Sequence, residues 1–96
     1  MMNISQVRIY PFDTGSLGGQ TRAYADITID DCLVLKGLRV VEAEGGGLFV
    51  AFPSQRGRNG RYYELVVPVD AATREYIRKT IVDAFKLWTP QEPNKE

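Results

Sequence analysis

The spacing of apolar residues changes once along this chain, and that change limits the folds open to it. Through most of residues 3–69 apolar and polar residues alternate, which is the period of half-buried β-strands. From residue 71 to residue 88 apolar residues recur every three or four positions, the period of an amphipathic helix. Strands followed by one helix are typical of an α+β domain. With 96 residues, the chain has room for one such domain and not for two.

The strand region divides at glycines, prolines and aspartates. Five strands are predicted, at residues 3–10, 21–30, 32–41, 48–52 and 61–69. Three glycines make Phe12–Gln20 a long, mobile hairpin loop. The pair Asp30 and Asp31 predicts a turn, because aspartate accepts local backbone hydrogen bonds. Gly37 predicts a bulge in the third strand.

The last two strands differ in their patterns. Leu48 to Phe52 is apolar on both faces, which predicts a central strand covered on both sides. The pair Asn59-Gly60 predicts the turn that follows. In the fifth strand one face is expected to carry Tyr63, Leu65, Val67 and Val69. Pro68 lacks an N–H donor, so the strand lies at an edge or stops there.

A helix is predicted from Ala71 to about Trp88, with Asp70 as its N-cap. Its main apolar stripe consists of Ile77, Ile81, Ala84, Phe85 and Trp88. A second, weaker stripe consists of Tyr76, Thr80 and Leu87, and the basic residues Arg78, Lys79 and Lys86 are expected to point away from the main stripe. The sequence therefore predicts a mainly antiparallel sheet of about five strands with one C-terminal helix.

A size estimate then points to a homodimer. Five strands at about 4.8 Å make a sheet roughly 20 Å wide. One helix is about 10 Å across and would cover about half of one face. A second copy of the chain is expected to cover the rest. The alternative is that curling of the strands and the long loop cover it.

The residues that are missing exclude several functions. The chain has no histidine and one cysteine, Cys32, so a histidine base, a Ser-His-Asp or Cys-His nucleophile, an internal disulfide and a Cys/His zinc site are ruled out. No apolar run exceeds five residues, and the N-terminus lacks the basic and apolar regions of a signal peptide. We therefore expect a cytoplasmic protein that is not an enzyme and has no cofactor, no membrane contact and no small-molecule substrate.

Three stretches, at residues 22–30, 38–54 and 60–74, together resemble the SpoVG family of bacterial septation and sporulation regulators. The most specific part is Gly-Leu-Phe-Val-Ala-Phe-Pro-Ser-Gln-Arg, from Gly47 to Arg56. The similarity extends over about residues 3–88, so residues 1–88 are predicted to be a single domain and residues 89–96 a flexible tail. The resemblance implies a small dimeric protein that binds DNA and RNA and regulates gene expression, septation and, in spore formers, sporulation.

The resemblance also implies where nucleic acid would bind, mainly through phosphate contacts. The matching basic residues are Arg56, Arg58, Arg61, Arg74, Arg78 and Lys79. Gln55 stands where the family usually has lysine. The charge distribution independently favours the same region: residues 55–86 carry a net charge of +3 and residues 1–54 a net charge of −2, although the whole chain is neutral. The alternative interpretation is an ordinary solvated hairpin tip.

Other residues suggest further sites. Tyr62 could stack on a base, although cross-strand packing is the more ordinary role for such a residue. Asp26, Asp30 and Asp31 could hold a cation but are more simply solvated acids. Cys32 is expected to be a buried, inert thiol. The three glycines at 45–47 precede a strand rather than a helix, which excludes a phosphate-binding P-loop.

The competing functional hypothesis is a protein-interaction module. It would act through an exposed sheet edge or through the stripe that contains Tyr76 and Leu87. Binding to phosphates weakens steeply as salt rises, whereas an apolar interface does not, so salt dependence separates the two hypotheses.

Overall fold

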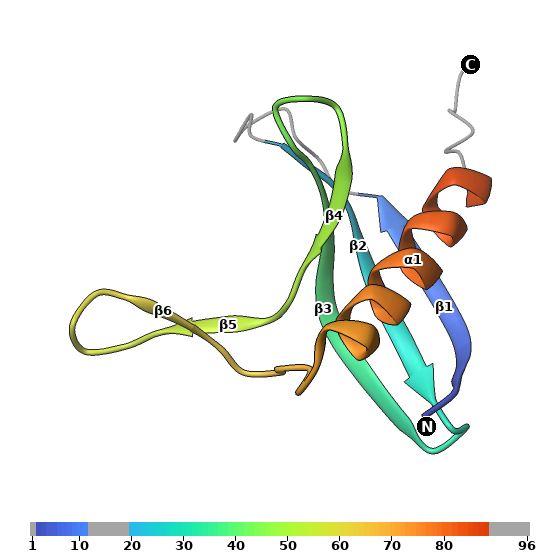
Figure 1. Cartoon of the computed structure of the whole chain (residues 1–96), viewed down its shortest axis with the longest axis horizontal. Coiled ribbons are helices and arrows are strands. Elements are labelled where there is room, and N and C mark those ends of the chain that lie inside the picture. Colours follow the sequence, from blue (N-terminus) through green and yellow to red (C-terminus); the bar gives the residue numbers. More distant parts are fainter. Residues whose placement is uncertain (1, 12–19, 89–96) are drawn as a thin grey trace.

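The computed structural model describes residues 2–11 and 20–88. The strands and the helix are β1 (Ile4–Pro11), β2 (Thr21–Ile29), β3 (Leu33–Glu42), β4 (Leu48–Ala51), β5 (Ser54–Arg56), β6 (Tyr62–Glu64) and α1 (Ala71–Trp88). The first four strands form one antiparallel sheet in the order β1-β2-β3-β4, and β5 and β6 form a separate hairpin (Figure 1). The predicted α+β class is confirmed. The predicted mobile loop, apart from Gln20, and the predicted tail at 89–96 lie outside the described residues.

The turn and the bulge predicted in the large sheet are both present. Asp30 and Asp31 adopt φ values of 52° and 57°, and the Cys32 N–H donates to the Ile29 carbonyl at 3.0 Å. Two left-handed residues give a tight turn whose twist matches the flanking strands. Further along, Lys36 and Gly37 together oppose the single residue Asp26, and Gly37 has a φ of 86°. These features set the register that places the alternate residues of β2 on the inner face.

The helix begins and ends where the sequence predicts. Asp70 Oδ1 accepts a hydrogen bond from the Thr73 N–H at 2.7 Å, which caps the first turn. Ile77 and Ile81 are buried, as their stripe requires, and Val82 is buried beside them. Val82 lies outside the predicted stripe, because the contact between helix and sheet is wider than one row of side chains.

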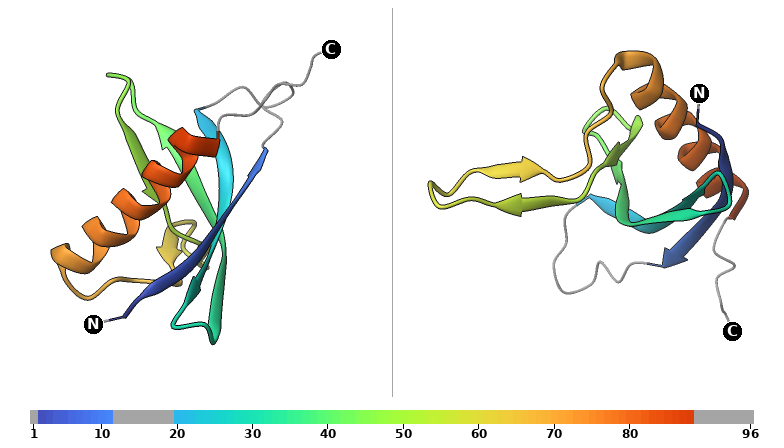
Figure 2. Two further views of the ribbon diagram at one scale, coloured as in Figure 1. Left: turned by 90° about the vertical axis from the view of Figure 1, so that its right-hand side faces the viewer. Right: turned by 90° about the horizontal axis from the view of Figure 1, so that it is seen from below.

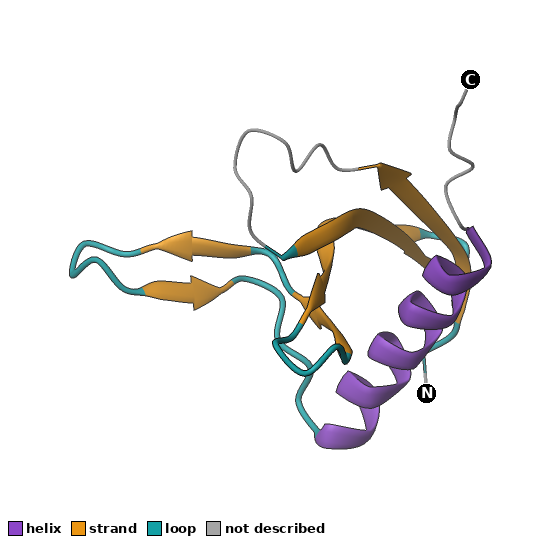
Figure 3. Ribbon diagram, turned by 90° about the horizontal axis from the view of Figure 1, so that it is seen from above, coloured by secondary structure: helices purple, strands orange, loops and turns teal. Residues whose placement is uncertain are grey.

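One helix covers the centre of the sheet's inner face. The strands curve around α1, which lies nearest to the outer strands β1 and β4 (Figures 2 and 3). Five inward-facing residues of the two central strands are fully buried, namely Ala23, Ala25, Ile27, Leu38 and Val40. The estimate that half of this face stays uncovered is therefore wrong, because it assumed a flat sheet of five strands. Curling of the strands, one part of the alternative named above, buries these residues, whereas the loop, its other part, lies outside the described residues apart from Gln20.

Two strand predictions are also wrong. β4 is an outer strand rather than a central one, and its Phe49 is 43% exposed. Apolar residues on both faces identify a strand that could be covered twice, but they do not show its place in the sheet. The strand predicted at residues 61–69 is β6, which is only three residues long, and residues 65–70 are irregular. The apolar residues predicted to share one face of this strand are all exposed, so their alternation does not indicate a buried face in this chain.

The part of the chain that the structure describes contains no helix long and apolar enough to cross a membrane.

Candidate nucleic-acid interface

The hairpin of β5 and β6 projects away from the sheet and the helix (Figures 1 and 2). The chain reverses between Gly57 and Gly60, where the Gly60 N–H donates to the Gly57 carbonyl at 3.0 Å. Gly60 has a φ of 84°, a conformation that glycine adopts without strain. Asn59 Oδ1 accepts the Arg61 N–H at 3.0 Å. The Asn-Gly turn predicted from the sequence is therefore present, and it closes a narrow arm.

The arm carries three of the six predicted binding residues, Arg56, Arg58 and Arg61. All three are exposed, and within residues 2–11 and 20–88 none of their side chains forms an ion pair or hydrogen bond. No acid lies between residues 55 and 63. The structure thus brings three uncompensated guanidinium groups together on one projecting element.

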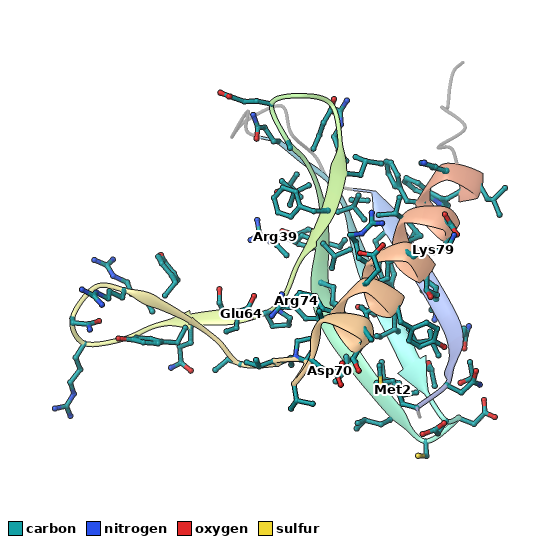
Figure 4. All side chains as sticks on the ribbon, viewed as in Figure 1. Met2, Arg39, Glu64, Asp70, Arg74 and Lys79 are labelled. Carbon is teal, nitrogen blue, oxygen red and sulfur yellow. The ribbon has the colours of Figure 1, made fainter. Side chains whose placement is uncertain are left out.

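Arg74 has a different environment at the base of the arm (Figure 4). Its Nη2 lies 3.1 Å from Glu64 Oε1, and its guanidinium lies 5.0 Å from the centre of the buried Phe52 ring. The Leu65 N–H also donates to the Pro53 carbonyl at 2.8 Å. Arg74 therefore links the start of the helix to the end of β6 at the point where the arm leaves the rest of the fold. Its charge is neutralised by Glu64.

The other two predicted helix residues are also paired. Arg78 donates to both Glu75 oxygens, at 2.8 and 2.5 Å, and more weakly to the Leu48 carbonyl at 3.4 Å. These hydrogen bonds raise the pKa of Arg78 and lower the pKa of Glu75. Lys79 Nζ lies 3.0 Å from Asp83 Oδ2. Arg78 was expected to point away from the core, but it is half-buried against β4.

The six predicted residues thus fall into two groups with different electrostatics. The arm residues present free positive charge, whereas each helix residue faces a carboxylate of this chain. An exposed ion pair contributes under about 1 kcal/mol, so a phosphate can compete for the helix residues, but only by displacing that carboxylate. The arm is the stronger anion-binding surface.

Sequence reasoning missed Glu64 and Tyr63 as residues that shape this surface. Glu64 neutralises Arg74 from ten positions away, and no local pattern signals such a pair. The Tyr63 hydroxyl accepts a hydrogen bond from Asn59 Nδ2 at 2.8 Å. The Asn-Gly turn is a partial signal for Tyr63, because the Asn59 side chain within the turn reaches the strand residue four positions later.

The remaining candidates lie elsewhere. Asp26 lies 3.7 Å from Lys36 Nζ and accepts the Gly37 N–H at 3.4 Å, on the wall of a pocket of about 200 Å³ on the outer sheet face. Asp30 accepts the Asn3 N–H at 3.1 Å, and the described residues contain no cluster of three metal-ligating side chains. The prediction for Cys32 is wrong: it is exposed, because it ends the tight turn between β2 and β3.

Fold and site together define a small α+β protein with a projecting, basic β-hairpin arm. When the chain is compared with known protein families, the SpoVG family model matches residues 2–87. A relative from Borrelia hermsii is 36% identical over 97% of this chain and 93% of its own length, and one from Treponema denticola is 36% identical over 99% and 97%. A third, from Fusobacterium nucleatum, is 37% identical over 88% of both chains, and all three carry the name "Putative septation protein SpoVG". The chain belongs to the SpoVG family.

Proposed function

We propose that this protein is a nucleic-acid-binding regulator of the SpoVG type, which acts in the cytoplasm on gene expression and on septation or sporulation-related processes. It binds the phosphate backbone of DNA or RNA through Arg56, Arg58 and Arg61. One observation carries the proposal: the three guanidinium groups lie on a projecting arm, and no carboxylate in the described part of the chain neutralises them. A guanidinium donates in a planar fork that fits two phosphate oxygens at once.

The proposed contact depends on the charge of the nucleic acid rather than on its base sequence. Phosphates carry no base identity, and Arg74, Arg78 and Lys79 of α1 are paired with acids of the same helix or of β6. Binding should therefore differ little between unrelated sequences. The role is binding rather than catalysis, since the chain has no histidine to serve as a base near neutral pH.

We also propose that the protein acts as a homodimer, although for a different reason than the size estimate gave. Several large apolar side chains are exposed at the outer strand and after the arm: Phe49 at 43%, Leu65 at 61%, Val67 at 57% and Val69 at 93%. Exposure of these four apolar side chains to water is unfavourable, and a second copy of the chain would cover them. A dimer presents two arms and six arm arginines to one nucleic acid. Sedimentation equilibrium should give about twice 10.8 kDa, and a monomer at tens of micromolar would refute this part.

The same exposed residues favour the second candidate function, a protein-interaction module without nucleic-acid contact. Its surface would be the outer strand β4 and the segment after β6. The stripe on α1 supports it less, because the Tyr76 hydroxyl accepts the Ile4 N–H at 2.9 Å and β1 occupies that side. Only Leu87 of that stripe is widely exposed, at 86%.

A binding titration separates the two candidates. The full chain is titrated into labelled DNA and RNA of mixed sequence at two salt concentrations. The proposal predicts binding that weakens steeply with salt and is similar for unrelated sequences. Absence of binding at the lower salt concentration would reject the nucleic-acid proposal and leave the interaction module.

A further inference from the structure

The two adjacent tyrosines of β6 have different surroundings. Tyr63 is held within the turn: its hydroxyl accepts from Asn59, and a Cβ added at Gly57 would lie 2.6 Å from its Cε2 atom. Tyr62 faces the opposite side of the hairpin and is 69% exposed. Within the described residues its side chain has neither a hydrogen bond nor a ring contact. Tyr63 therefore has a structural role, which Tyr62 lacks.

The residue directly opposite Tyr62 is Arg56. The Gly57 N–H donates to the Arg61 carbonyl at 2.7 Å, which makes the Arg56–Tyr62 pair the next, non-hydrogen-bonded pair of the ladder. Side chains of such a pair lie closest together on the same face. The Arg56 guanidinium extends toward the turn, with Nη2 3.8 Å from the position of a Cβ built on Gly60. An open aromatic ring and a free guanidinium thus project from the same face of the hairpin.

These two groups match the two parts of an unpaired nucleotide. Its base offers a flat face to an aromatic ring, and its phosphate accepts from a guanidinium. A base within a duplex is stacked on both sides, so the ring reaches it only after unstacking. We infer that Tyr62 and Arg56 together bind one unpaired nucleotide, so that single-stranded DNA or RNA is the preferred ligand. This inference rests on the proposed function and adds to it the strandedness of the ligand.

Variants of Tyr62 test the inference in the full chain. The probes are a labelled single strand of about 20 nucleotides, as DNA and as RNA, and the matching DNA duplex. Tyr62→Ala should weaken binding to both single strands by roughly tenfold, leave duplex binding unchanged and leave the salt slope unchanged, because stacking releases no counterions. Tyr62→Phe should bind like the parent, since it keeps the ring. Leu87→Ala, the loss of an exposed apolar side chain at the last turn of α1, should also bind like the parent.

Three results would overturn the inference: an unchanged affinity of Tyr62→Ala for single strands, an equal loss on single strand and duplex, or a change in sedimentation mass. The last would show that the ring packs against another copy. Failure of the proposed function has a different signature, because the parent protein would then bind none of the probes. If Arg56→Ala weakened binding while Tyr62→Ala did not, the arm would remain the contact surface and only the stacking role would fail.

Discussion

The contact between helix and sheet depends most heavily on Ile81, and its truncation gives a quantitative test of the fold. Ile81 is fully buried under the curved sheet. Ile81→Ala removes three carbon atoms, and about 0.8 kcal/mol for each gives roughly 2.4 kcal/mol of lost transfer free energy. The cavity left behind adds to this, and such substitutions total about 2–5 kcal/mol. We expect the free energy of unfolding to fall by about 3–4 kcal/mol.

Denaturant unfolding followed by the fluorescence of Trp88, the chain's one tryptophan, measures this loss. For a domain of this size the melting temperature should fall by roughly 12–30 °C. Leu87→Ala is the matched control on the same helix, because Leu87 is 86% exposed and its truncation should change stability by less than about 0.5 kcal/mol. Equal losses for the two variants, or a loss below about 1 kcal/mol for Ile81→Ala, would refute the packing described for α1.

Two further perturbations test local features. Hydrogen bonds from the Thr73 side chain and N–H lower the pKa of Asp70 from its usual 3.8, so the cap stabilises the fold above that pH and the contribution disappears as pH falls through the lowered pKa. Asp70→Ala should therefore be less stable than the parent at pH 7, and thermal melts from neutral pH to below 3 should show the difference narrowing; a constant difference would contradict the charged cap. Gly57→Ala should push the Tyr63 ring out of place and speed amide exchange in the arm, whereas Gly45→Ala, which meets nothing within 4 Å, should not. If amide exchange in the arm of Gly57→Ala matched that of the parent, the Tyr63 ring would be able to move aside without disturbing the hairpin, which would contradict this expectation.

The sequence was sufficient where a feature depends on nearby residues. The turn at Asp30 and Asp31, the bulge at Gly37 and the Asp70 cap each arise from the conformational preference of one or two residues. The bounds of α1 follow from that cap and from the apolar period. Local signals of this kind do not depend on the rest of the fold.

Features set by distant contacts could not be predicted. The place of β4 at the outside of the sheet depends on which strands pair, and its apolar pattern is the same in either position. The curling that buries Ala25 under a single helix depends on the twist accumulated over four strands. For the candidate site, charge clustering predicted an exposed basic segment, and Arg56 and Arg58 are indeed exposed on the arm. It could not show that Arg74 faces Glu64, because only the folded chain brings those two residues together.

The central claim is that free arginines of the arm bind phosphates, and the salt dependence of one double variant tests it most directly. Affinity for one duplex is measured across a range of salt concentrations for the parent, for Arg56→Ala combined with Arg58→Ala, and for Arg22→Ala. Arg22 is a matched control, since it is exposed, paired with Glu42 and far from the arm in sequence.

Each phosphate contact contributes about 0.9 to the slope of log affinity against log salt on duplex DNA. The double variant should therefore lose about two units of slope per protomer, or up to about four in a dimer, while its melting temperature stays unchanged because both side chains are exposed. Arg22→Ala should keep the parental slope. A double variant that binds as tightly as the parent with the same slope would contradict the account.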